Sequence, residues 1–186
     1  MWPLKAHYVL WFGSLSGILP FVFLFARNHL GVSATAVGNL FCIIPFVVSI
    51  GKPVACSIAD QHGQHSQTLI TAQIFTLFSY GSLITIPFLL EYFSTSVLWV
   101  LFIVLCFVAN VAMGVGTSLT DYLVINEVNL INQAGGNTNY GSFRIWGTVG
   151  FGFFGILAGV INHVSKHLPY LIPGLCLYIA IECIDI

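Results

Sequence analysis

The chain of 186 residues is 58% apolar and only 6% charged. A soluble domain carries roughly 25% charged residues, so this chain has too few to cover the surface of a water-soluble globule. Five Lys and Arg residues against six Asp and Glu give a net charge of −1 with no basic run, which excludes nucleic acid as a partner. The composition predicts an integral, multi-pass membrane protein whose main partner is the lipid bilayer.

Six segments are apolar and long enough to cross a bilayer. A crossing needs about 20 apolar residues, and backbone groups in lipid must bond within their own segment, which favours helices over strands. The predicted spans run over residues 6–27, 35–59, 68–90, 97–121, 143–162 and 169–186, separated by polar stretches that include the Asn-rich segment 126–142. The predicted fold class is all-α, a membrane helix bundle of one domain over residues 1–186.

Prolines interrupt the first three spans, at Pro20, Pro45, Pro53 and Pro87. Each removes a backbone hydrogen bond and bends its helix, and bent helices line cavities better than straight ones. The alternative is that proline is simply common in membrane helices.

The loop after the second span contains Asp60, His62, Gly63 and His65. The helix dipole disfavours a carboxylate at a helix C-terminus, so we expect Asp60 to interact with the N-terminus of another helix or with a cation from outside this loop. Histidines ordinarily titrate near pH 6.5, so a stronger contact of the loop in acid is a further hypothesis. The alternative is a solvated turn in which Gly63 supplies a left-handed bend.

The fourth and fifth spans carry small residues in helical register. Gly152, Gly155 and Gly159 recur at i, i+3 and i+7 and form one bare stripe, while the fourth span has a similar patch at Gly114, Gly116, Thr117 and Ser118. We predict that these two spans pack closely against each other. The alternative is that the glycines face lipid.

Asp121 ends the fourth span and Arg144 opens the fifth, so the two charges reach the same side of the membrane. Ionisable side chains at membrane depth face a cavity or one another, so we predict an Asp121–Arg144 ion pair. The alternative is that Arg144 extends to the lipid interface. Lys5 and Lys52 fall on the same side against Arg27 and Lys166 on the other, a margin too small to fix the orientation.

The stretch YGSFRIWGTVG at residues 140–150 resembles the YGxxRxWGSxG signature that opens the fifth helix in the lactose-permease-like, MFS_1-like branch of the major facilitator superfamily. This branch includes sugar and nucleoside symporters and the animal domain-containing-6 proteins. Residues 16–25 and 30–38 and the pair Thr120-Asp121 are also similar to the family's pattern. In the loop CSIADQHGQH at 56–65, Asp60 and Gly63 match the superfamily motif, but its first glycine and its arginines are missing.

This resemblance implies the N-terminal six-helix half of a twelve-helix fold, with six more helices expected beyond Ile186. The expected partner is this missing C-terminal half or a second copy of the chain. It also implies a secondary active transporter that works by alternating access, with Arg144 contacting a small polar solute such as a sugar or nucleoside. Trp146 or Tyr140 would offer the solute a flat face. Asp121, or Glu127 in the Asn-rich loop, would couple transport to protons or act as a gate, since solute that draws Arg144 away favours protonation of Asp121.

The alternative function is a non-transporting membrane protein that serves as a receptor, scaffold or assembly partner. An enzyme is not expected, because there is no HExxH motif, no paired aspartates on facing helices and no serine–histidine arrangement. We expect no cofactor and no metal, and interpret the five cysteines as small buried hydrophobes. The remaining histidines and three tryptophans are interpreted as interfacial anchors: His7, His29, His163, His167, Trp2, Trp11 and Trp99. The expected location is a plasma membrane or a bacterial inner membrane.

Overall fold

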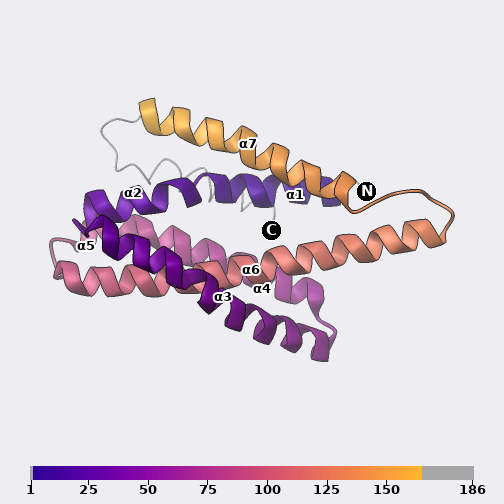
Figure 1. Ribbon diagram of the computed structural model, residues 1–186, viewed down its shortest axis with the longest axis horizontal. Coiled ribbons are helices and arrows are strands. Elements are labelled where there is room, and N and C mark those ends of the chain that lie inside the picture. The colour runs from indigo at the N-terminus through magenta and orange to yellow at the C-terminus, as the bar shows by residue number, and fades with distance from the viewer. Residues whose placement is uncertain (1, 165–186) are drawn as a thin grey trace.

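The computed structural model describes residues 2–164, and these residues form helices joined by short connections (Figure 1). Five helical segments are long and apolar enough to span a membrane: Trp2–His29, Ala34–His62, His65–Leu89, Thr95–Gln133 and Gly141–Val164. The first five predicted spans are therefore present. The sixth, at 169–186, lies outside the described residues.

Proline divides the first and third spans. Two residues separate helix α1 (Trp2–Ser16) from α2 (Leu19–His29), which has Pro20 in its first turn. The third span consists of α4 (His65–Gly81), the 3-10 helix η1 (Ser82–Thr85) and α5 (Ile86–Leu89), with Pro87 in the first turn of α5. Because proline has no backbone N–H, each break falls where that donor is not required.

The second span stays helical across both of its prolines, because α3 (Ala34–His62) contains Pro45 and Pro53 in its interior. Ser33 caps the N-terminus of α3, and its side chain accepts a hydrogen bond from the Ala36 N–H at 3.2 Å. Gly63 caps the C-terminus and adopts the left-handed conformation with φ of 64°. Glycine is suited to this position because it has no side chain to clash there.

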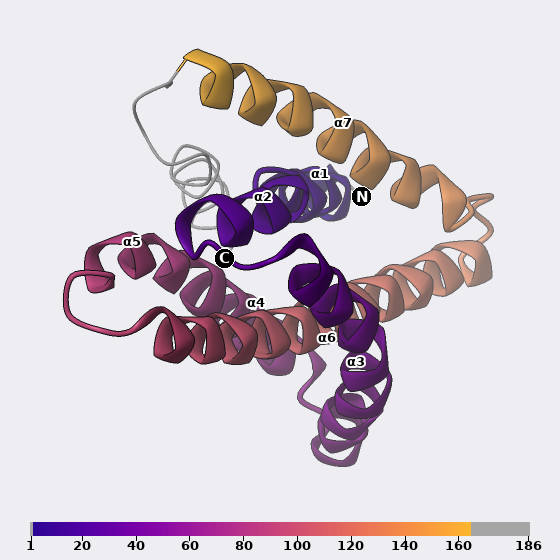
Figure 2. The ribbon, with the colours of Figure 1, turned by 60° about the vertical axis from the view of Figure 1, so that its left-hand side comes forward.

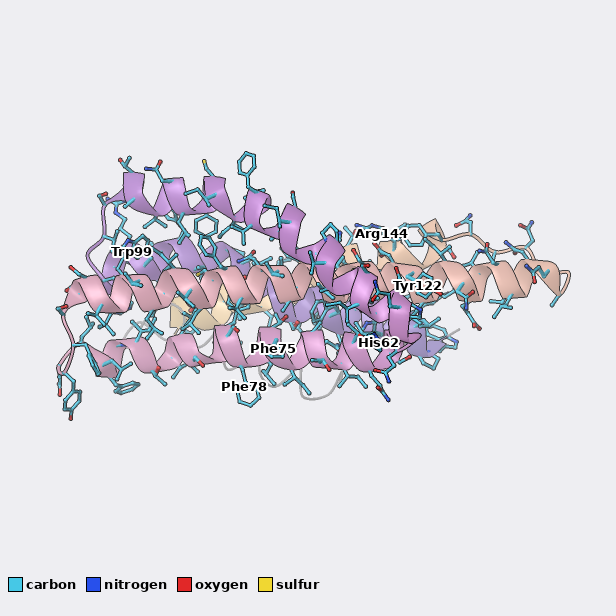
Figure 3. The ribbon with its side chains drawn as sticks, turned by 90° about the horizontal axis from the view of Figure 1, so that it is seen from below. His62, Phe75, Phe78, Trp99, Tyr122 and Arg144 are labelled. Carbon is cyan, nitrogen blue, oxygen red and sulfur yellow. The ribbon has the colours of Figure 1, made fainter. Side chains whose placement is uncertain are left out.

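Helix α6 (Thr95–Gln133) is longer than the sequence predicts. Its 39 residues extend about 58 Å, nearly twice the roughly 30 Å of bilayer hydrocarbon. Figure 3 shows α6 continuing beyond the end of α3 that His62 marks. The Asn-rich segment predicted as a loop at 126–142 is therefore helical up to Gln133.

Packing explains this extension. Val124 and Val128 lie one turn apart on α6 and are buried in a cluster with Tyr8 and Phe143. Their apolar contacts hold the helix together, while the exposed asparagines of the same segment point outward. The polar composition of this segment concealed the apolar residues four positions apart that are buried against α1 and α7.

Helix α7 (Gly141–Val164) packs along α1, which lies between α7 and α6 (Figures 1 and 2). The nearest ring carbon of Phe12 lies 2.7 Å from where a Cβ on Gly147 would be, and the Val9 carbonyl oxygen lies 2.3 Å from the corresponding point on Gly150. Only glycine allows so close an approach of two helices.

The predicted packing of the fourth and fifth spans through their glycines is wrong. Among the described residues, nothing lies within 4 Å of a Cβ built on Gly152 or Gly159, and Gly155 faces Ser16 of α1. On α6, Gly116 receives the Trp11 ring and Gly114 receives Val48 of α3. The spacing of the glycines correctly identified helix faces without side chains, but it did not identify which helices pack against them.

The outward faces of the bundle are apolar, as a bilayer requires. Phe46 and Ile50 of α3 and Phe78 of α4 are each about 70% exposed (Phe78 points away from the bundle in Figure 3). Such side chains would be costly in water, but they are well placed against lipid.

Candidate functional site

Helices α1, α6 and α7 bring four polar side chains together at the end of the bundle that holds the N-terminus of α1. Tyr8 comes from α1, Asp121 from α6, Tyr140 from the connection before α7 and Arg144 from the first turn of α7. We call these four residues the Asp121 cluster.

The predicted ion pair between Asp121 and Arg144 is present. Nη1 of Arg144 lies 2.8 Å from Oδ2 and 3.0 Å from Oδ1 of Asp121. The Asp121 side chain is 25% exposed and that of Arg144 is 48% exposed. Arg144 therefore does not extend away from the acid to the lipid interface.

Two tyrosines complete the shell of the carboxylate. The Tyr8 hydroxyl donates to Asp121 Oδ1 at 2.6 Å, and the Tyr140 hydroxyl donates to the same oxygen at 2.8 Å. Arg144 Nη1 donates in turn to the Tyr140 oxygen. An ionised carboxylate only accepts hydrogen bonds, so three donor groups from three segments match its chemistry.

Sequence reasoning did not identify Tyr8, although it is fully buried in the first span. A tyrosine hydroxyl in an apolar helix needs a partner, and the N-terminus lies at the same end of the bundle as Asp121. These two facts together are the signal that could have predicted the contact.

A second row of contacts ties α1 to α6 beside the cluster. His7 Nε2 lies 2.9 Å from Thr120 Oγ1, and Trp11 Nε1 donates to Thr117 Oγ1 at 3.2 Å. Trp11 is fully buried, so its interpretation as an interfacial anchor is wrong. This row fixes the register of α1 against the residues that flank Asp121.

Trp146 lies on a different side of α7 from Arg144, because residues two apart on a helix do not share a face. Its ring packs edge-on against Trp2, with ring centroids 6.0 Å apart. The Lys5 ammonium lies over three rings, 5.5 Å from Trp2, 5.6 Å from Phe143 and 5.9 Å from Trp146. These cation–π contacts attach the start of α1 to the start of α7.

A pocket of about 220 Å³ borders Arg144 on the α1–α7 face. Its lining comes from Phe12, Arg144, Gly147, Thr148 and Phe151. The guanidinium and the Thr148 hydroxyl are the polar groups among otherwise apolar or bare positions. The structure thus places Tyr140 and Arg144 together and Trp146 outside this pocket.

Glu127 lies on α6 rather than in a loop, six residues and about 9 Å along the helix beyond Asp121. Six residues correspond to about one and two-thirds turns, so the two carboxylates occupy different faces. Among residues 2–164, no ion pair joins Glu127 to the Asp121 cluster.

The loop at 60–65 adopts the solvated turn that was the alternative prediction for Gly63. Asp60 is 69% exposed and lies 3.7 Å from Nδ1 of His65, the first residue of α4. The expectation that its partner lies outside this loop is therefore wrong. His62 is not part of the pair, because its Nδ1 contacts the Ile58 carbonyl at 2.9 Å.

Within residues 2–164, no group of three His, Cys, Asp or Glu side chains is arranged to hold a metal ion. Cys42, Cys56 and Cys106 are unpaired, and of these Cys106 is buried and Cys42 exposed.

Comparison with family models matches residues 1–186 to the MFS_1 like family. The chain belongs to this family. This is a family of membrane transporters, which agrees with the apolar spans of an integral multi-pass protein. No curated protein and no solved structure matches the chain.

Proposed function

We propose that this chain forms the six-helix half of a secondary active transporter that moves a small polar solute, such as a sugar or nucleoside, by alternating access and in symport with protons. The observation that carries the proposal is the Asp121 cluster, where a carboxylate on α6 accepts hydrogen bonds from α1, from the connection before α7 and from α7, and where Arg144 borders a pocket. Intramembrane charges are costly, and they mark solute and proton pathways in membrane proteins.

Arg144 is the residue proposed to contact solute. Its bonds to Asp121 and Tyr140 all come from Nη1, although a guanidinium has five N–H donors. The remaining donors are available to a solute hydroxyl or carbonyl in the pocket beside Thr148. The rigid fork of a guanidinium suits such bidentate recognition.

Asp121 is the residue proposed to couple solute to protons. While Arg144 is bound to it, the carboxylate is stabilised in its ionised form. When solute draws the guanidinium away, the acid keeps only tyrosine hydroxyls in a site of low dielectric constant, where the neutral form is favoured. Solute binding and proton uptake are then linked. Glu127 is outside the cluster, so we assign it no part in this step.

The exchange of access requires a second rigid body against which these helices rock. The proposed partner is a C-terminal half of the same protein, or a second copy of this chain. A receptor or scaffold that does not transport is the competing function, and the same experiment separates the two.

The test is uptake by the full-length protein in proteoliposomes, with a panel of sugars, nucleosides and organic acids and an imposed proton gradient. We expect gradient-driven uptake that falls at least about tenfold in Arg144→Gln and loses its dependence on the gradient in Asp121→Asn. Arg27→Gln is the matched control, because Arg27 is an exposed cation in the last turn of α2. Uptake that survives Arg144→Gln would contradict the assigned site, and a protein that carries no member of the panel would favour the receptor.

A further inference from the structure

A second cation, Lys52, lies deep in a membrane-spanning helix and takes no part in the Asp121 cluster. It is ten residues before the end of α3 at His62, or about 15 Å along the axis, close to the middle of the helix. Its side chain is half-buried. A lysine at this depth is expensive unless it serves a site.

The stem of Lys52 lies on the polar face of α6. Its Cδ is 3.7 Å from where a Cβ on Gly114 would be. Gly114, Thr117 and Asp121 recur on α6 at i, i+3 and i+7 and so share one face. Lys52 therefore stands over the same stripe as Asp121, about 10 Å deeper along α6.

The opposite side of the α3–α6 contact is apolar, which makes the position of Lys52 distinctive. A groove of about 430 Å³ there is lined by α3, α4 and α6 through side chains such as Val47, Phe75 and Val111 (Phe75 is labelled in Figure 3). Val111 packs directly on Gly51, next to Lys52 in the sequence. Lys52 is not among the residues that line this groove, and its stem lies beside Gly114 instead.

No carboxylate in residues 2–164 forms an ion pair with Lys52. Asp121 is bound by Arg144, and Asp60 faces His65. On this face Arg144 and Lys52 are the two cations and Asp121 is the acid. Because Arg144 pairs with Asp121, the charge of Lys52 is not balanced by a carboxylate of residues 2–164. A compact ammonium in that position attracts an anionic oxygen.

We propose that Lys52 binds the anionic group of the transported solute, which makes that solute a small organic anion with a carboxylate or phosphate group. The inference rests on the proposed transport function and narrows its substrate class. Lys52 lies at the α3–α6 contact and is not among the residues that line the pocket beside Arg144, so its contact with the solute is separate from that of Arg144.

The test uses the full-length protein in proteoliposomes with solutes that share a skeleton but differ in charge: glucose, gluconate and glucose 6-phosphate; glycerol, glycerate and glycerol 3-phosphate; uridine and uridine monophosphate. We expect the charged members to be carried. For the solute carried best, Lys52→Gln and Lys52→Met should raise KM about tenfold, while Lys52→Arg stays within about threefold of the parent. Arg27→Gln again controls for the simple loss of a positive charge.

Each other outcome overturns the inference in a recognisable way. Uptake of a neutral solute that needs Arg144 but is unaffected by Lys52→Gln would leave the transport function intact and remove the role of Lys52. Unfolding temperatures that fall in both neutral variants, with KM for solute unchanged, would assign Lys52 to an acid elsewhere in the protein. An effect seen only in vesicles with anionic lipid, and absent in pure phosphatidylcholine, would assign it to a lipid headgroup. No uptake of any solute would remove both proposals together.

Discussion

Two aspartates at the same end of the bundle have very different surroundings. Asp121 is 25% exposed and receives hydrogen bonds from two tyrosines and an arginine, whereas Asp60 is 69% exposed and only approaches His65 at 3.7 Å. Water competes strongly for Asp60 and weakly for Asp121. The comparison shows that the number of elements contributing donors, more than the presence of an acid, distinguishes a site from a solvated turn.

Helix packing produces this difference. Gly147 and Gly150 let α7 approach α1 so closely that Tyr8 and Arg144 reach the same carboxylate. Asp60 lies at the end of α3, where only the first residue of α4 is near. Each prediction below changes one of the two sites and uses the other as its control.

The largest effect is expected for the acids themselves. Asp121→Asn leaves Arg144 without its counter-charge and should cost about 2–3 kcal/mol in free energy of unfolding, because the pair is only partly exposed. Asp60→Asn should cost below about 1 kcal/mol. The measurement is denaturant unfolding of the full-length protein in detergent. Exchanging the charges, with Asp121→Arg and Arg144→Asp together, should recover part of the loss. Equal costs at the two acids would break the comparison.

The next effect tests the packing that assembles the cluster. Gly150→Ala puts a methyl group against the Val9 carbonyl and should cost about 2 kcal/mol, and uptake should fall as Tyr8 and Arg144 move apart. Gly152→Ala, with open space among the described residues, should be neutral or stabilising by up to about 1 kcal/mol. The unfolding temperatures of the two variants decide the matter. A similar loss in both would show that glycine content, not the α1–α7 contact, controls stability.

A smaller effect is expected from the tyrosine beside each acid. Tyr8→Phe keeps the buried ring and removes the 2.6 Å bond to Asp121, at a cost of about 1–1.5 kcal/mol. Tyr122 packs against His65 of the other site, with ring centroids 4.6 Å apart and ring planes tilted by 43°, so Tyr122→Phe, which keeps the ring, should change stability by less than about 0.5 kcal/mol. Both variants are compared by denaturant unfolding. If the Tyr8→Phe protein were as stable as its parent, the Tyr8 hydroxyl would not contribute to the stability of the Asp121 cluster.

The smallest effect depends on pH. An imidazole attracts Asp60 only when it is protonated, so the contribution of this pair to stability should be larger in acid than in base. His65→Gln should therefore lower stability in acid, by less than about 1 kcal/mol, and have a smaller effect in base. His62→Gln, which leaves the pair intact, should show no such difference. A pH-independent effect of His65→Gln would assign its role to contact with Tyr122 alone.

Much of this protein could be predicted because the relevant information is local. Runs of apolar residues located the first five spans, since crossing a bilayer depends on length and hydropathy. Every predicted end lies within four residues of the observed one, except the C-terminal end of the fourth span. The ion pair followed from alternation: one span ends and the next begins on the same side, so Asp121 and Arg144 had to meet at similar depth. The bend at Gly63 followed from the freedom of glycine.

The failures concern which face of a helix meets which neighbour. The glycine stripe from Gly152 to Gly159 was real, but α7 leans on α1 through Gly147 and Gly150 instead. Trp146 is close to Arg144 in the sequence and yet on another side of the helix. The α6 extension was hidden because asparagines dominate its composition, while two valines decide its packing.

The sequence by itself determined that this chain enters a membrane as helices, and that an acid and an arginine share one end of the bundle, because hydropathy, helix length and the alternation of direction require no knowledge of neighbours. The tertiary structure alone decided that Tyr8 completes the carboxylate's shell, that α1 separates α7 from α6, and that Lys52 stands over the Asp121 stripe without a counter-charge among the described residues. These depend on the rotation and tilt of each helix against the others, which are set by where side chains interlock and not by any single segment.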